Sequence, residues 1–260
     1  MTPTTTRVAP ALRALLENLI DYAGMYPPAG LPLEQTLQNY GTYRDGDYSW
    51  MLRWLVIGGA DLTKVPASLD GALAVLAESE ETRAASLETK GVVSAQRPVY
   101  VEVALNDLNK LDAVKQAGCF GKIRTGGVKP EAIPTPADVA AFILACADRR
   151  LPFKATAGLH HPIRAEYALT YESDAPRAVM HGFLNVLMAS AFAWQGERDI
   201  EPIIAETDAG AFSFDDEHGR WRDKSVSTTQ IRDARQNFMH SMGSCSFDEP
   251  VHELQALGLI

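Results

Sequence analysis

VYVEVALNDLNKLDAVKQAGCFGKIRTGGVKPEAIPTPADVAAFILACADRRLPFKATA, residues 99–157, is the stretch that decides the fold of this chain. It holds three short apolar runs, at Val99–Leu105, Phe120–Thr125 and Pro152–Ala157. Runs of this length, bounded by glycine, proline or polar residues, are typical of buried strands. The stretch therefore predicts three strands of one sheet.

Two helical segments separate these strands. Asp107–Ala117 has apolar residues at helical spacing and ends before Gly118. The second helix begins at Pro136 and runs to about Arg149, and Thr135 before it matches a threonine N-cap followed by proline. Strand, helix, strand, helix, strand at this spacing predicts right-handed βαβ units in a parallel sheet.

The rest of the chain supplies enough strand candidates to close a barrel. A length of 260 residues suits one (β/α)8 TIM-like barrel, so we expect a single α/β catalytic domain over residues 1–260. A doubly wound open sheet is the alternative. The eight candidate strands are 18–23, 52–57, 72–77, 99–105, 120–125, 152–157, 182–187 and 203–214.

Further helices are expected outside the central stretch. Glu34–Arg44, Glu78–Leu87 and Thr228–Ser241 have helical patterns. His181–Trp194 is apolar nearly throughout, and it fits either a strand that leads into a helix or one buried helix. The sequence therefore does not decide between strand and helix at the start of this segment, and the fold of the last third of the chain stays open.

The bulk composition argues against several classes of partner. The net charge is -9 and the pI is about 5.2, whereas nucleic acids and anionic membrane surfaces bind net basic faces. No run of apolar residues is long enough for a membrane span, and the first residues lack the apolar core of a signal peptide. We expect a cytoplasmic protein, with a homo-oligomer as one possible assembly.

Cysteines and short motifs give no sign of a cofactor. The three cysteines, Cys119, Cys146 and Cys245, form no CxxC pair, and an odd number argues against a disulfide framework. Cys245 fits a buried structural cysteine better than a nucleophile. The sequence has neither a dinucleotide-binding GxGxxG nor a Walker A motif, so no nucleotide cofactor is expected.

Polar residues inside the central strands carry the functional hypothesis. Strands of a parallel sheet are covered on both faces and should be almost wholly apolar. Here Glu102, Lys122 and Arg124 interrupt two strands, and Lys154 and Thr156 interrupt the next. Residues two apart share one face of a strand. Such groups are costly to bury unless they pair or bind a ligand, so we expect an active site at the carboxyl ends of these strands.

The loops after these strands add candidate contacts. Thr125, Gly126 and Gly127 follow the second strand, where glycine lets backbone N–H groups approach a ligand closely. His160 and His161 follow the third strand, in KATAGLHHP, and are candidate acid/base groups. Both loops are expected to border the site.

The expected pocket is net positive. Lys122, Arg124 and Lys154 outnumber Glu102, which indicates a small anionic substrate that carries a phosphate or carboxylate group. Arg124 suits a two-point contact with such a group. Lysines near other cations have lowered pKa values and can form Schiff bases, so Lys154 and Lys122 are candidate nucleophiles.

These residues resemble the class I aldolase barrels of the deoxyribose-phosphate aldolase type. The resemblance implies that Lys154 of FKATAG forms the Schiff base, that Glu102 of VYVEVALND assists proton transfer, and that Lys122 corresponds to a lysine between them. The family's further lysine has no counterpart in HGFLNVLM, and its carboxylate is aspartate rather than glutamate. About a quarter of the chain carries the resemblance.

Three further polar residues are candidate substrate contacts. His181 and Asn185 lie in an otherwise apolar stretch and need polar partners. Tyr22 ends the first expected strand, next to a proline-rich loop.

The main functional hypothesis is an enzyme that acts on a small anionic carbonyl or sugar-phosphate-like substrate, of lyase, aldolase or isomerase type. One alternative is a metal-assisted enzyme that uses the His160–His161 loop, with a third ligand from His181, Glu206 or Asp208. Another is a non-catalytic protein that binds a small anion.

Overall fold

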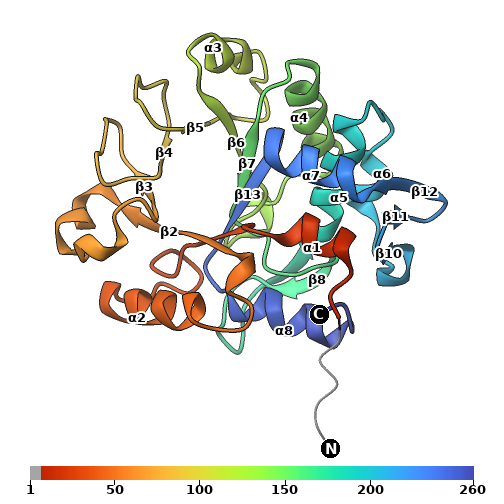
Figure 1. Cartoon of the computed structure of the whole chain (residues 1–260), viewed down its shortest axis with the longest axis horizontal. Coiled ribbons are helices and arrows are strands. Elements are labelled where there is room, and N and C mark those ends of the chain that lie inside the picture. Colours follow the sequence, from red (N-terminus) through yellow and green to blue (C-terminus); the bar gives the residue numbers. More distant parts are fainter. Residues whose placement is uncertain (1–6) are drawn as a thin grey trace, which may run out of the picture.

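Eight parallel strands close into a barrel at the centre of the computed structural model, which describes residues 7–260 (Figure 1). This confirms the expected TIM-like α/β barrel, and the doubly wound open sheet is wrong because the first and last strands pair. Around the barrel the strands are β1 (Ile20–Tyr22), β2 (Leu52–Gly58), β3 (Leu73–Leu76), β4 (Ser86–Thr89), β5 (Val99–Glu102), β6 (Phe120–Arg124), β7 (Phe153–Thr156) and β13 (Met239–Ser244).

Two of the expected barrel strands are wrong. Segment 182–187 is the start of helix α5 (Phe183–Trp194), which is apolar on all sides because other elements bury all of them. Segment 203–214 contains the end of α6 (Glu201–Ala205) and strand β10 (Phe212–Phe214), which belongs to a separate sheet. Neither segment contributes to the barrel.

The strands that replace them come from segments where we expected helix. Segment 78–87 has no helix and is mostly a charged loop that leads into β4. The sequence of β4, SLET, shows no apolar run and too little period-2 alternation to predict a strand. Helix α7 (Thr228–Asn237) ends four residues before Ser241, and the chain continues directly into β13. β13 reads MHSMGS, which lacks the β-branched residues that usually mark a strand.

The most regular part of the barrel is the stretch that predicted it. Helices α3 (Lys110–Gln116) and α4 (Pro136–Asp148) follow β5 and β6. The Thr135 side chain accepts a hydrogen bond from the Asp138 amide, and the Asp138 carboxylate accepts one from the backbone N–H of Thr135. This capping box fixes where α4 begins.

Other helices surround the barrel or close its ends. They are α1 (Pro10–Leu16), α2 (Leu33–Arg44) and α8 (Asp248–Ala256), together with the short 3-10 helices η1 (Ser49–Met51), η2 (Gly59–Lys64), η3 (Ala67–Leu69), η4 (Pro130–Ala132) and η5 (Ala209–Ala211). Within residues 7–260, no helix is both long and apolar enough to cross a membrane.

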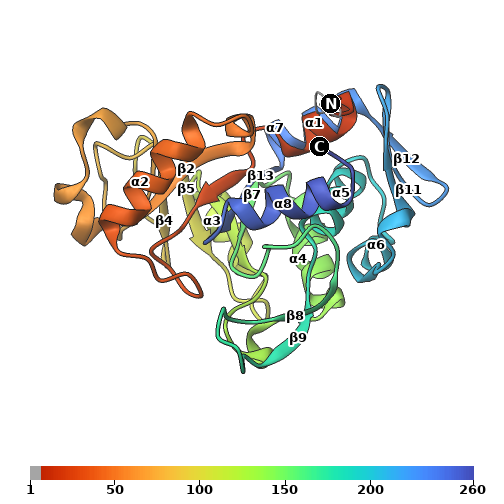
Figure 2. The same cartoon turned by 90° about the horizontal axis from the view of Figure 1, so that it is seen from below.

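A long insertion separates β7 from the last barrel strand. It contains an antiparallel pair, β8 (Ala165–Ala168) and β9 (Arg177–Met180), and an antiparallel sheet of β10, β11 (His218–Trp221) and β12 (Lys224–Ser227). Figure 2 shows β8 and β9 projecting from one end of the molecule, with β11 and β12 at its side.

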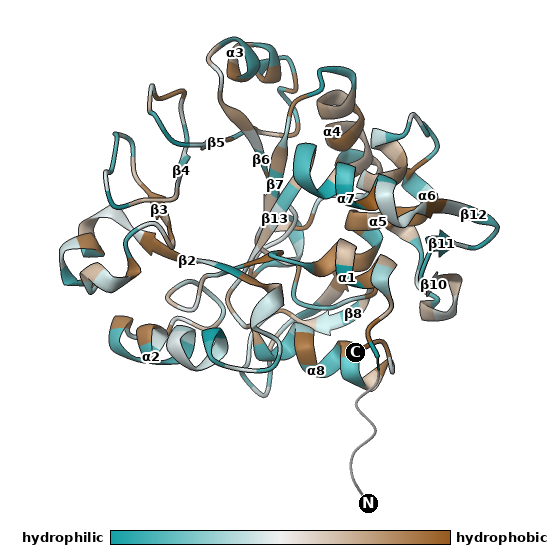
Figure 3. Ribbon diagram, viewed as in Figure 1, coloured by the Kyte–Doolittle hydropathy of each residue, from teal (hydrophilic) through white to brown (hydrophobic). Residues whose placement is uncertain are grey.

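The apolar core lies between the barrel and its helices. Residues 183–193 of α5 are all buried, and α4 buries Phe142 and Ile143 completely. In Figure 3, hydrophobic colours follow α4, whereas α7 is mostly hydrophilic. The interior of such a barrel is usually filled by layers of apolar side chains. Here the charged side chains of Asp21, Glu88, Lys122 and Lys154 occupy part of it.

Candidate active site

A buried ion pair crosses the interior of the barrel. The Lys154 ammonium nitrogen lies 2.5 Å from a carboxylate oxygen of Asp21 and 2.5 Å from one of Glu88. These residues come from β7, β1 and β4, which are not neighbours in the barrel, so their side chains meet across its interior. Ser241 of β13 donates a hydrogen bond of 2.6 Å to Asp21.

The same network continues to Lys122 nearer the barrel mouth. Lys122 lies 3.2 Å from Glu88 and 3.2 Å from Glu102. Parallel register places Glu102, Lys122 and Lys154 side by side on β5, β6 and β7. The network therefore alternates in sign from Asp21 through Lys154, Glu88 and Lys122 to Glu102.

These neighbours determine the protonation of the inner pair. Burial alone would lower the pKa of Lys154, yet the carboxylates of Asp21 and Glu88 raise it above its ordinary value. Burial would raise the pKa of Glu88, but Lys154 and Lys122 lower it. The expected low pKa of Lys154 is therefore wrong, because its closest charged groups are carboxylates.

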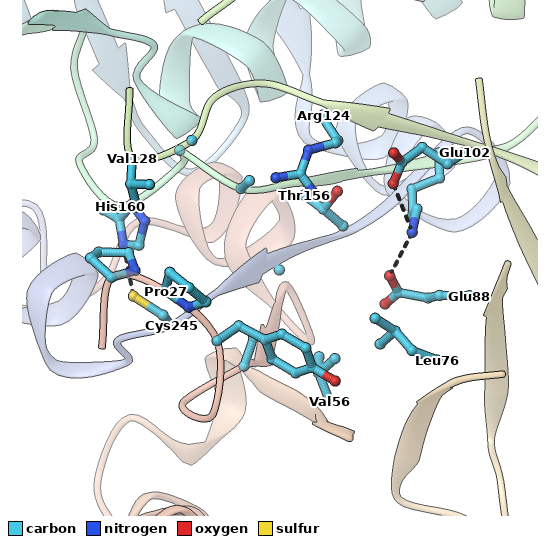
Figure 4. Close-up of a pocket in the computed structure, with 18 of the residues that line it drawn as sticks. Pro27, Val56, Leu76, Glu88, Glu102, Arg124, Val128, Thr156, His160 and Cys245 are labelled. Atoms are coloured by element: carbon cyan, nitrogen blue, oxygen red, sulfur yellow. Dashed lines mark hydrogen bonds and ion pairs between the residues drawn. The ribbon is translucent and has the colours of Figure 1, made fainter. Parts of the chain in front are cut away.

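A cavity of about 480 Å³ lies above this network, at the carboxyl ends of the strands (Figure 4). Figure 4 shows Arg124, Glu102 and Glu88 on one side of it and His160 with Cys245 on another. Six of the residues singled out from the sequence line it: Glu102, Lys122, Arg124, Gly127, Thr156 and His160.

Three other candidates lie next to the cavity without lining it. Lys154 is completely buried beneath it. The Thr125 hydroxyl donates to the backbone oxygen of Ala157 at 2.6 Å. A Cβ on Gly126 would stand 2.9 Å from the Cα of Gly158, so a side chain there would separate the two loops. Thr125 and Gly126 therefore hold the cavity wall in place.

Two candidates near the loops make contacts away from the cavity. His161 is 2.6 Å from Glu253 and stacks on Tyr167 with ring centroids 3.4 Å apart. The Tyr22 hydroxyl accepts a hydrogen bond of 3.2 Å from Asn39. The expected roles of His161 in catalysis and of Tyr22 in substrate binding find no support in this geometry.

The polar pair in the apolar stretch is also structural. Asn185 donates to the backbone oxygens of Ile203 and Glu206 and accepts from the Arg164 amide. His181 lies 2.8 Å from the backbone oxygen of Pro134. Neither side chain lines the cavity, so the expected substrate contacts at His181 and Asn185 find no support in this geometry.

The pocket is not net positive as expected. Asp21 and Glu88 add two carboxylates that the expected pocket did not include, so three carboxylates balance the charges of Lys122, Lys154 and Arg124. Within residues 7–260, however, Arg124 has no carboxylate oxygen within 4 Å, and its side chain lies at the cavity. Lys90 also lines the cavity without an ion-pair partner among these residues, so the positive charge available to a ligand is local, at Arg124 and Lys90.

A second polar cluster forms another part of the cavity wall. The Nδ1 atom of His160 lies 3.7 Å from the thiol of Cys245 and 3.4 Å from Glu249. Burial would lower the pKa of His160, but Cys245 and Glu249 raise it to about 9. His160 is thus protonated at neutral pH and suits an acid. Cys245, expected to be structural, lines the cavity instead.

The two histidines do not converge on one point, as a shared metal would require. Their ring centroids are 6.3 Å apart, and Nδ1 of each faces a different glutamate. Across the described chain, no group of three or more His, Cys, Asp or Glu side chains is arranged to hold a metal ion.

Comparison with models of protein families finds no match for this chain, and comparisons with curated proteins and with solved structures find no significant match either.

Proposed function

We propose that this protein is an enzyme that acts on a small anionic carbonyl compound or sugar phosphate, and that it breaks a bond next to the carbonyl through a Schiff base on Lys122. The observation that carries the proposal is a cavity in which Lys122, Glu102 and Arg124 lie together at the carboxyl ends of β5 and β6. The carboxyl end of a β/α barrel is where catalytic residues gather.

Lys122 is better placed for this role than Lys154. Both lysines lie between carboxylates, but Lys122 borders the cavity while Lys154 is completely buried. Lys154 instead acts as the fixed cation that holds Glu88 ionised beside Lys122. The proposed chemistry resembles that of the Schiff-base aldolases, but the reacting lysine is Lys122 on β6 and not Lys154 on the neighbouring strand β7.

The spacing of β6 suggests the size of the substrate. Lys122 and Arg124 are two residues apart on one face, which places their Cα atoms roughly 7 Å apart. A phosphate or carboxylate bound by Arg124 would leave a carbonyl a few bonds away at Lys122. This separation fits a short-chain compound, and the cavity volume of about 480 Å³ accommodates one.

The residues supply each proton transfer that the reaction needs. Glu102 takes a proton from the Lys122 ammonium, and the resulting amine adds to the carbonyl carbon. Glu102 passes this proton to the carbonyl oxygen, then moves a second proton from the nitrogen of the carbinolamine to the same oxygen, so water leaves and an iminium forms. The C–H or C–C bond next to the iminium carbon then breaks, its electron pair forms an enamine, and Glu102 accepts the proton released from that C–H bond or from the hydroxyl of the leaving fragment. Return of a proton to the enamine carbon gives an iminium again, and its hydrolysis restores Lys122.

His160 is the proposed second acid/base group. Its position on another part of the cavity wall suits the portion of the substrate away from Lys122, where a leaving carbonyl or hydroxyl exchanges a proton. Thr156 and Gly127 also line this cavity.

Solvent hydrogen exchange tests the proposal without knowledge of the full reaction. The protein is incubated in deuterium oxide with a panel of short aldehydes, ketones and keto acids that carry a phosphate or carboxylate, and deuterium next to the carbonyl is measured by mass spectrometry. We expect exchange with at least one compound, its loss in Lys122→Met, and no change in Lys129→Met, a lysine outside the cavity. Tight binding without exchange across the panel would favour a non-catalytic anion-binding protein.

A further inference from the structure

A second cavity, of about 420 Å³, lies at the opposite end of the barrel. Arg53, Tyr100 and His240 are each the second residue of their strands, β2, β5 and β13, and Phe120 is the first residue of β6. The cavity therefore opens at the amino ends of the strands. Nothing in the proposed reaction uses this end.

Three arginines line this second cavity. Arg232 and Arg235 are three residues apart on α7 and so share one face of the helix. Arg53 lies at a bulge, where two residues of β2 stand opposite one residue of β1, and a bulge re-aims side chains. Two separate elements thus bring three guanidinium groups to one opening.

None of these arginines is neutralised within the part of the chain that the structure describes. Several arginines elsewhere pair with carboxylates, as Arg198 does with Asp148 at 2.5 Å. Arg53, Arg232 and Arg235 have no carboxylate oxygen within 4 Å among residues 7–260, although the molecule has 33 acidic residues against 24 basic ones. An uncompensated cluster in an acidic protein needs a reason.

Buried guanidinium atoms of Arg53 and Arg235 add to this need. Arg53 Nη1 is buried and has no hydrogen-bond partner, which is costly for a charged donor. Arg235 is buried, and its guanidinium donates to backbone oxygens, including Leu15 at 2.8 Å and Glu17 at 3.1 Å. Burial and Arg53 lower the pKa of Arg235 to about 9, so the two cations disfavour each other.

Neutral groups complete the floor of the second cavity. The Tyr100 hydroxyl and His240 Nδ1 are 2.7 Å apart. Burial and the nearby arginines lower the pKa of His240 to about 4, so it is uncharged at neutral pH and can accept a hydrogen bond from the Tyr100 hydroxyl. Glu17 is the one carboxylate residue of the lining, so the lining keeps a net positive charge.

We propose that this cavity is a binding site for a small oxyanion, the phosphate or carboxylate group of a small molecule, held by Arg53, Arg232 and Arg235. A guanidinium presents paired N–H donors that match the oxygens of such groups. The anion would supply the missing partner of Arg53 Nη1 and separate its charge from that of Arg235. This site is distinct from the cavity at Arg124.

Calorimetric titration of the full-length protein with inorganic phosphate, at constant ionic strength set with chloride, tests the proposal. We expect saturable binding, weakened about tenfold or more in Arg53→Met and in Arg232→Met. Arg232 is exposed on α7, so its variant remains informative if Arg53→Met fails to fold. Arg198→Met, which removes a paired arginine, should bind phosphate as the wild type does.

Two further variants locate the bound phosphate. Arg53 lies over the ring of Trp54, with its guanidinium carbon 3.7 Å from the ring centroid, so binding should change tryptophan fluorescence in the wild type and not in Trp54→Phe. Arg124→Gln should leave this binding intact, which separates it from the proposed active site. The proposal is overturned if phosphate does not bind at millimolar concentration, or if binding survives Arg53→Met and Arg232→Met but is lost in Arg124→Gln.

Discussion

Lys154 and Glu88 come from strands that are not neighbours in the barrel, yet the ammonium nitrogen of one lies 2.5 Å from a carboxylate oxygen of the other. A barrel interior is normally filled by branched apolar side chains. Here an alternating network fills it, and its outermost lysine, Lys122, borders the cavity. The same ion-pair network therefore contributes to the stability of the barrel and holds Lys122, the proposed reacting residue, in place.

Removal of Lys154 should destabilise the protein strongly. Lys154→Met leaves Asp21 and Glu88 buried without their cation, and we expect a loss of about 3–5 kcal/mol in the free energy of unfolding. Urea denaturation measures it. Arg198→Met, which breaks an exposed pair, should cost under about 1 kcal/mol. If Lys154→Met/Glu88→Gln is no more stable than Lys154→Met, the unpaired carboxylate is not the cause.

Stability should depend on pH through His160. Its pKa is raised to about 9 in the folded protein, against about 6.5 in an unfolded chain, so the folded state favours the protonated form. This contribution is fully present below about pH 6.5 and is lost as the pH rises to about 9. We expect the wild type to lose about 2–3 kcal/mol more than His160→Gln across this window, by urea denaturation at each pH. Parallel curves for the two proteins would contradict the raised pKa.

Arg124 should control affinity for the anionic group of a ligand. It borders the cavity and pairs with no carboxylate within residues 7–260, so Arg124→Gln removes a charge that only a ligand would use. We expect a loss of about 1.5–3 kcal/mol in binding of an anionic compound, measured by calorimetry. A neutral compound of the same shape is the control, and an equal loss for both would show that Arg124 shapes the cavity instead.

Cys245 should be the most reactive of the three cysteines. It lines the cavity beside His160, whereas burial raises the pKa of the Cys146 thiol. Protonated histidine stabilises a neighbouring thiolate, so iodoacetamide should modify Cys245 first in the folded protein and more slowly in His160→Gln. Peptide mapping over time measures this. Earlier modification of Cys119 or Cys146 would contradict the assignment.

The sequence predicts the central part of the fold well because its signals are local. Each strand of 99–157 lies within an apolar run that extends beyond the strand itself, and the Thr135 cap marks a helix start. β4 and β13 are missed for different reasons: β4, with the sequence SLET, lies in no apolar run, and β13 lacks β-branched residues and follows a helix directly. The buried helix α5 has no polar face, so periodicity alone does not separate it from a strand.

The site is predictable only where its residues share a strand or a loop. Period-2 spacing correctly brings Lys122 and Arg124 together, and parallel register adds Glu102 and Thr156. The contact of Lys154 with Asp21 and Glu88 depends on closure of the barrel, which no local pattern encodes. Glu88 was also hidden by the missed strand. For the same reason, the sequence suggested a low pKa for Lys154 where the structure raises it.

Borohydride trapping tests the central claim most directly. The protein is treated with borohydride in the presence of a compound that undergoes solvent exchange, and intact mass and peptide mapping locate the reduced adduct. We expect one adduct, on Lys122, which is absent in Lys122→Met and retained in Lys129→Met. An adduct on Lys154, or exchange that proceeds with no trapped adduct on any lysine, would contradict Schiff-base chemistry at Lys122.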